Sequence, residues 1–180
     1  MQRFRVVSVL VVLVLTACGA AADSTPPAAE STTPEWFDME LTDVQTGEVF
    51  VVNDYAGEVV LLETMAMWCP NCIVQANEVR NLHEALGYPE DLVSVSLDVD
   101  INEDAPSLSD YASGYGFTWH FAVAPLEVAR ALGTLYTPQY LNPPLAPMLI
   151  IDREGNVHHL EYGIKDVETL RKAVEPYLAE

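Results

Sequence analysis

The stretch Trp68-Cys69-Pro70-Asn71-Cys72 decides how the rest of the chain is interpreted. An apolar, strand-like run from Val59 to Leu62 leads into it, and a segment with apolar residues at helical spacing follows it. In this order, the first cysteine lies at the start of a helix, where unpaired backbone N–H groups stabilise a thiolate. The second thiol lies close enough to form a disulfide with the first. The stretch therefore predicts a redox-active cysteine pair.

The chain has 180 residues, half of them apolar, which is enough for one domain with a sizeable core and some appendages. Its formal net charge of −19 argues against binding nucleic acid or an anionic lipid surface, since the protein would not neutralise the negative charges of either. The three cysteines are too few for a disulfide framework. The four histidines do not supply the second ligand pair that a structural zinc site needs. We therefore expect no cofactor and no metal.

The N-terminus has the pattern of an export signal. Two arginines precede a short apolar run, Val6 to Leu15, which is too short to span a bilayer. The run ends in Leu15-Thr16-Ala17-Cys18, which resembles a bacterial lipoprotein signal, in which the cysteine becomes the lipidated first residue. We expect a signal peptide over residues 1–17, and a lipidated Cys18 with a flexible linker over residues 18–35. The folded domain should cover residues 36–180.

The remaining pattern alternates strands with helices and predicts an α/β domain around a central sheet. The interval from Glu35 to Val52 has the pattern of an N-terminal β element with a turn at Thr46-Gly47. Five strands are expected after it, over residues 59–64, 92–97, 119–123, 148–151 and 157–162. A final helix, capped by Asp166, is expected to follow them. Helices are expected after Cys72, near 101–116 and over 125–132, with Gly133 as the C-cap of the last of these.

From about Trp36 to Leu178 the chain resembles thioredoxin-fold proteins, and most closely the membrane-anchored thiol–disulfide oxidoreductases of the TlpA/ResA type. Four features carry the resemblance: the Trp68-Cys69-X-X-Cys72 motif after a strand, Pro147 before the strand 148–152, the turn 152–155, and Gly163 before the last helix. The resemblance implies a mixed sheet flanked by helices, with an N-terminal hairpin and an inserted strand–helix between Cys72 and Pro147.

The resemblance also implies roles for individual residues. Cys69, the more exposed of the pair, would attack a substrate disulfide, and Cys72 would resolve the mixed disulfide. Glu63, near the end of a buried strand, would have a raised pKa and take the proton from Cys72. Pro70 and Asn71 would tune the reduction potential.

A substrate-binding role falls to three further residues. Trp68 would pack beside the cysteines. Pro147 is the candidate cis-proline, and the backbone of Ala146 would pair with a bound peptide as an added strand.

The function that follows is that of an extracytoplasmic oxidoreductase, held on a bacterial membrane by lipid on Cys18. We expect it to reduce disulfides in exported proteins, for example during cytochrome c maturation, with electrons from a membrane thiol donor. Two alternatives stay open. One is a thiol peroxidase, although Thr64 lies five residues before Cys69 and the proline of that family's motif is missing. The other is a copper-binding module resembling the SCO family, using His120 or His158, although that family has three residues between its cysteines.

Two further groups of residues could indicate a metal site. Three methionines (Met65, Met67 and Met148) fall near the cysteines, and thioethers with thiolates bind Cu(I), although such residues are more often core. The acidic stretch from Asp98 to Asp104 lacks the glycine and terminal glutamate of a calcium-binding loop. We expect it to be a solvated loop.

Overall fold

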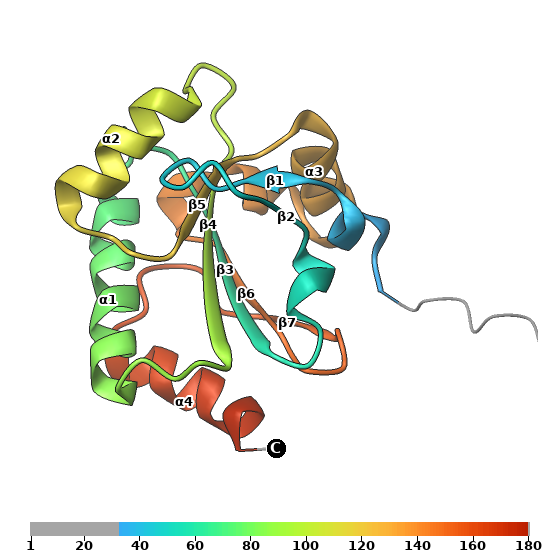
Figure 1. The fold of residues 1–180 in the computed structure, drawn as a ribbon, viewed down its shortest axis with the longest axis vertical. Coiled ribbons are helices and arrows are strands. Elements are labelled where there is room, and N and C mark those ends of the chain that lie inside the picture. The colour runs from blue at the N-terminus through green and yellow to red at the C-terminus, as the bar shows by residue number, and fades with distance from the viewer. Residues whose placement is uncertain (1–32, 180) are drawn as a thin grey trace, which may run out of the picture. The chain divides into compact units, whose positions relative to one another are not determined.

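The computed structural model describes residues 33–179. The predicted signal peptide, Cys18 and nearly all of the predicted linker lie outside these residues. The described part is an α/β fold built on a five-stranded sheet with the order β5-β4-β3-β6-β7 (Figure 1). The predicted fold class is confirmed, including the mixed sheet and the small N-terminal hairpin.

The sheet combines a parallel half with an antiparallel half. The strands are β3 (Val59–Met65), β4 (Leu92–Asp98), β5 (His120–Val123), β6 (Met148–Ile151) and β7 (Val157–His159). β3 pairs in parallel with β4, and β4 with β5, whereas β6 runs antiparallel to both β3 and β7. All seven residues of β3 are buried because it is the central strand and both of its faces are covered. This explains why its sequence is a continuous apolar run rather than an alternating one.

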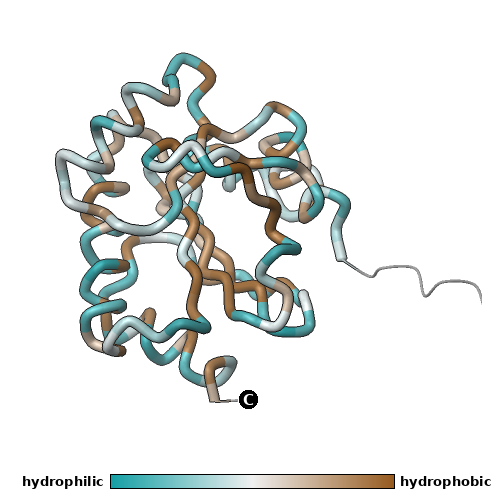
Figure 2. The backbone as a smooth tube through the Cα atoms, in the orientation of Figure 1, coloured by the Kyte–Doolittle hydropathy of each residue, from teal (hydrophilic) through white to brown (hydrophobic). Residues whose placement is uncertain are grey.

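Two layers cover the sheet, and alternate residues of β3 point into each. The helices α1 (Pro70–Leu86), α2 (Ala105–Tyr115) and α4 (Val167–Leu178) pack on the face that carries Leu61 and Met65. On the other face, Val60 and Leu62 contact the N-terminal segment and α3 (Leu126–Ala131). Figure 2 shows apolar residues concentrated in the central strands between these layers.

The N-terminal segment covers one face of the sheet. It contains the 3₁₀ turn η1 (Glu35–Asp38), the short strands β1 (Leu41–Thr42) and β2 (Val49–Phe50), and the 3₁₀ turn η2 (Val52–Tyr55). β1 and β2 form the expected antiparallel hairpin, with Gly47 at φ +76° in the turn. Trp36 and Phe37 of η1 are fully buried in the second core.

The segment between α3 and β6 differs from the prediction. Gly133 does not cap α3, because the chain continues into the π-helical turn η3 (Leu132–Tyr136). Two 3₁₀ turns follow where a loop was expected, η4 (Pro138–Leu141) and η5 (Pro143–Leu145). η5 leads into β6 and places the proline-rich segment beside the start of α1.

No helix within residues 33–179 has both the length and the apolar character needed to cross a bilayer.

Candidate functional site

The two motif cysteines form a disulfide at the start of α1. Cys69 is the N-cap residue, with extended backbone angles, and Pro70 occupies the first helical turn, where its missing N–H costs nothing. The backbone N–H of Cys72 donates to Cys69 Sγ at 3.2 Å. The Cα atoms of the pair are 5.3 Å apart, within the usual range for a disulfide. This is the arrangement that the sequence predicted, with a helix N-terminus directed at the first sulfur.

Both cysteines are covered, so the prediction that Cys69 is the more exposed one is wrong. Cys69 is 1% and Cys72 is 2% exposed. Cys72 Sγ lies 3.5 Å from the carbonyl oxygen of Pro143, and Asn71 Nδ2 donates to the carbonyl of Pro144 at 2.8 Å. The turn η5 therefore lies over the disulfide, and Asn71 ties it in place.

Glu63 lies on the face of β3 that the disulfide helix covers. It is 4% exposed, and Ser96 Oγ donates to its Oε1 at 2.5 Å. Burial raises the pKa of Glu63 to about 7, although the Ser96 hydrogen bond and the charge of Lys165 act in the opposite direction. The carboxyl group therefore has a pKa suited to exchanging protons near neutral pH.

Lys165 is a site residue that the sequence analysis missed. It is 4% exposed, and Nζ donates to the carbonyl oxygens of Ala146 at 2.5 Å and Gly163 at 2.6 Å. Gln75 of α1 holds the Lys165 backbone through both amide atoms. Burial lowers the pKa of Lys165 to about 8, and the charge of Glu63 opposes that shift. No local signal marks this residue, because Ala146 and Gln75 lie far from it along the chain.

The expected cis-proline is not observed. Residues 33–179 contain no cis peptide bond, so the Ala146–Pro147 bond is trans. The chain turns into β6 instead through Ala146, which adopts the left-handed region with φ +43° and ψ +58°. The Ala146 N–H donates to the Pro143 carbonyl and its own carbonyl accepts from Lys165. Both backbone groups that were assigned to a bound peptide are therefore used within the protein in this conformation.

Trp68 is exposed beside the disulfide. Its side chain is 57% exposed, and Nε1 donates to Asp100 Oδ2 at 2.6 Å. A shallow hollow of about 200 Å³ lies next to it. The hollow is lined by Trp68, Val99, Asp100, Ile101, Leu141 and Pro143. Because Ile101 and Leu141 are 88% and 43% exposed, apolar side chains border the cysteine site on this side.

The acidic stretch after β4 is not simply solvated, which corrects the expectation from the sequence. Asp98 is fully buried, and Glu103 is half-buried. Glu103 accepts hydrogen bonds from the backbone N–H groups of Met67 and Trp68, the two residues before Cys69. The stretch therefore supports the loop that leads into the motif.

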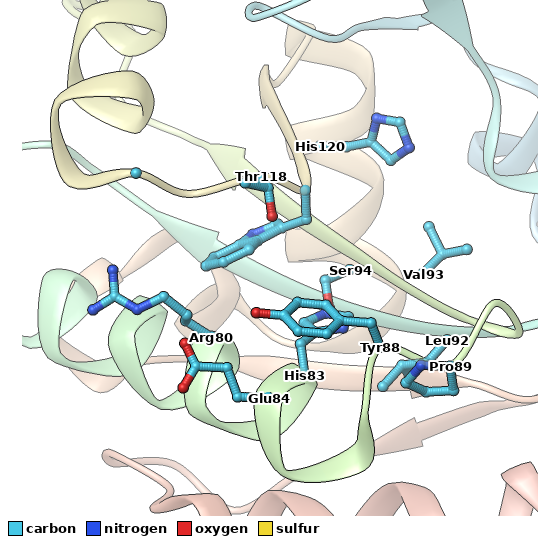
Figure 3. A pocket seen from close by; sticks show the side chains of 12 residues that line it. Arg80, His83, Glu84, Tyr88, Pro89, Leu92, Val93, Ser94, Thr118 and His120 are labelled. Carbon is cyan, nitrogen blue, oxygen red and sulfur yellow. The ribbon is translucent and has the colours of Figure 1, made fainter.

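A second cavity, of about 440 Å³, lies between α1 and the edge of the sheet (Figure 3). The His83 ring lies between the rings of Tyr88 and Trp119, and His83 Nε2 is 2.8 Å from Ser94 Oγ. Trp119 Nε1 donates to Ser96 Oγ at 2.9 Å, and Ser96 in turn donates to Glu63. The wall of this cavity is thus connected by hydrogen bonds to the buried carboxyl group.

The residues that a thiol peroxidase or a copper-binding module would use form other contacts in this structure. The Thr64 hydroxyl, which a thiol peroxidase would use, donates to the Tyr140 carbonyl at 2.7 Å. His120 is paired with Asp43, and His158 with Asp152. Across residues 33–179, no three His, Cys, Asp or Glu side chains are grouped as a metal ion would require.

Comparisons with known proteins agree with the fold. The model of the family described as Redoxin matches residues 9–175. No curated protein matches the chain. Among solved structures, a thioredoxin-family thiol:disulfide interchange protein from Chlorobium tepidum is 19% identical with a TM-score of 0.62, over 78% of this chain and 92% of that one.

Two further solved structures share the fold. A secreted disulfide oxidoreductase from Mycobacterium tuberculosis, described as homologous to DsbE of E. coli, is 16% identical with a TM-score of 0.59, over 79% of this chain and 98% of that one. BsSco, a member of the Sco family of cytochrome c oxidase assembly proteins, is 16% identical with a TM-score of 0.60, over 76% of this chain and 89% of that one.

Proposed function

Because the chain belongs to the Redoxin family and is a thiol–disulfide oxidoreductase with its disulfide at Cys69–Cys72, we propose that it reduces disulfides in exported proteins from a position on the outer face of a bacterial membrane. The observation that carries the proposal is the disulfide at the N-terminus of α1, with the buried carboxyl group of Glu63 on the same face of the sheet.

The reaction starts from the reduced pair. The Cys69 thiolate attacks one sulfur of a partner disulfide, and the partner's other sulfur leaves as a thiolate. Cys72 then loses its proton to Glu63 and attacks the Cys69 sulfur, which releases the partner's second thiolate. Two electrons pass to the partner, and the Cys69–Cys72 disulfide forms. A membrane thiol donor reduces that disulfide again.

The surroundings of the cysteines support the reducing direction. A dithiol is a stronger reductant when its surroundings do not stabilise the thiolate, because the reduced state is then less favoured. In the described part of the chain, no Lys or Arg side chain donates to the segment 66–72, whereas the carboxylates of Asp100 and Glu103 both accept from Trp68. Pro70 and Asn71 also contribute no charge, so the helix N-terminus is the main stabilising influence on the thiolate.

Substrate binding in this proposal involves Trp68, Ala146 and Pro147. Trp68 offers an exposed apolar surface next to the sulfurs. The Ala146–Pro147 segment would accept an extended peptide once η5 has moved away and Ala146 has exchanged its internal hydrogen bonds for bonds to the substrate.

Membrane attachment is proposed through lipid on Cys18 after removal of residues 1–17, with residues 18–35 as the tether. The support is the pattern in the sequence, namely a basic start, a short apolar run and small residues before the cysteine. Labelling with a radioactive fatty acid should mark the wild-type protein and not a Cys18→Ala variant. Labelling of both would refute the anchor.

The central experiment is trapping. A Cys72→Ser variant cannot complete the second step, so it should accumulate mixed disulfides between Cys69 and its partners. Exported thiol proteins among the trapped partners, together with a reduction potential well below the poise of the compartment, support the proposal. It fails if trapping occurs in Cys69→Ser and not in Cys72→Ser, or if the measured potential is strongly oxidising.

A further inference from the structure

The end of β4 buries a carboxyl group that is only partly satisfied. Asp98 is fully buried, although carboxylates are rarely so without partners. Its Oδ1 accepts from the Asp100 N–H at 2.9 Å, whereas no group in the described part of the protein donates to its Oδ2. An ionised carboxylate with one bare oxygen in the interior is costly, so this group requires an explanation.

The neighbouring acid, Glu103, supports the backbone just ahead of the nucleophile. One of its oxygens accepts from the Met67 N–H at 2.7 Å, and the other accepts from the Trp68 N–H at 3.3 Å. Hydrogen bonds between an ionised acceptor and backbone N–H groups are stronger than neutral ones. Glu103 in its ionised form therefore holds the two residues that precede Cys69.

The two carboxyl groups also meet each other. Asp98 is within hydrogen-bonding reach of Glu103, and burial raises the pKa of Asp98 to about 7, with Glu103 adding to that shift. The hydrogen bond from the Asp100 N–H opposes that shift, whereas the charge of Asp100 adds to it. Burial, with the charges of Glu63, Glu103 and Asp98, raises the pKa of Tyr111 of α2. Two carboxyl groups this close do not both ionise readily, and a proton between them gives Asp98 the donor that makes the contact favourable.

We propose that Asp98 and Glu103 share one proton, and that the pair positions the Met67–Trp68 backbone ahead of Cys69 and thereby sets the reactivity of that thiol. Protonated Asp98 donates to Glu103, and Glu103 keeps its charge and its two backbone contacts. Loss of the shared proton adds a second negative charge beside the motif and weakens the grip on the loop. Asp98 and Glu103 are positioning residues, since neither contacts a sulfur.

This inference rests on the proposed role of Cys69 as nucleophile, and it predicts in which direction the pair shifts the titration of the Cys69 thiol. As the shared proton leaves, the extra charge opposes ionisation of the Cys69 thiol and shifts its titration to higher pH. An Asp98→Asn variant keeps a donor to Glu103 and never gains the second charge. It therefore mimics the protonated form at every pH.

The test measures the pH dependence of Cys69 alkylation in the reduced full chain, followed by peptide mass spectrometry so that Cys18 and Cys72 do not interfere. The matched control is Asp110→Asn, the same change at an exposed position on α2. The Cys69 thiol of Asp98→Asn should titrate at lower pH than that of wild type, and at pH 8 it should react on the order of threefold to tenfold faster. Asp110→Asn should follow wild type.

A second measurement separates positioning from charge alone. Glu103→Ala removes the acceptor for Met67 and Trp68, so amide hydrogen exchange at these two residues should become at least about tenfold faster. In Asp98→Asn the exchange of both amides should stay slow.

Three results would overturn the inference. These are superimposable alkylation profiles for Asp98→Asn and wild type, unchanged amide exchange in Glu103→Ala, and loss of folding in Asp98→Asn at pH 6, where the amide should replace a protonated acid without harm. None of these measurements uses a protein partner, so they remain decisive even if trapping finds no exported substrate.

Discussion

Replacing Glu63 with glutamine should make the oxidised protein more stable at neutral and alkaline pH. The unfolded carboxyl group loses its proton near pH 4.5, whereas the folded one keeps it up to about pH 7. Between these values the unfolded state binds fewer protons, so wild-type stability falls as pH rises through this window and is level above it. The difference between the two pKa values, at about 1.36 kcal/mol for each pKa unit, corresponds to about 3 kcal/mol.

The comparison of variant with wild type isolates this effect. The glutamine side chain does not titrate and can still accept from the Ser96 hydroxyl, so at pH 4 the two proteins should differ by less than about 1 kcal/mol. At pH 8 the variant should be more stable by about 3 kcal/mol. Asp98 titrates in the same window in both proteins, and its contribution cancels in the difference.

The assay is urea denaturation of the oxidised protein at several pH values, followed by far-ultraviolet circular dichroism. Glu84→Gln, the same change at an exposed position on α1, serves as the control and should show no such pH-dependent gain. The reasoning is refuted if the difference between Glu63→Gln and wild type stays constant from pH 4 to pH 8. It is refuted equally if the variant is the less stable protein at pH 8.

Two further substitutions test contacts that lie apart from the buried acids. Asn71→Ala removes the hydrogen bond to the Pro144 carbonyl that ties η5 over the disulfide, so reduction by a small thiol should become roughly threefold to tenfold faster. A stopped-flow trace with dithiothreitol measures this, and an unchanged rate would show that the tie does not control access. Arg153→Met removes donors to Asp91 and to the carbonyls of Gly57 and Tyr177 while keeping an apolar stem. It should lower the free energy of unfolding by about 2–3 kcal/mol in urea, and a loss below about 0.5 kcal/mol would show that these hydrogen bonds contribute little to stability.

The central part of the fold could be predicted because its signals are local. The apolar run of β3 and the motif that follows it are close together in the sequence, and capping residues mark the start of α4 and the end of α1. Asp166 accepts from the Thr169 N–H at the start of α4, as predicted. Gly87 ends α1 at φ +73°, a conformation that glycine adopts without a steric penalty.

The parts that could not be predicted depend on contacts between distant residues. The sequence places Asp98 in an acidic run, and its burial follows only from the packing of β4 under the motif helix. Lys165 shows the same limit, since Ala146 and Gln75 are 19 and 90 residues away from it along the chain. The cover over the disulfide is a third case, because the contacts of η5 with Cys72 and Asn71 span 71 and 73 residues.

The cover over the sulfurs has a consequence for how the protein would coexist with other redox agents. A disulfide whose two cysteines are buried exchanges slowly with the surrounding pool of small thiols, whatever its reduction potential. Electrons would then leave or enter mainly through proteins able to displace Pro143–Leu145 while they dock. A buried disulfide of this kind lets an oxidising and a reducing pathway operate in one compartment without exchanging electrons with each other.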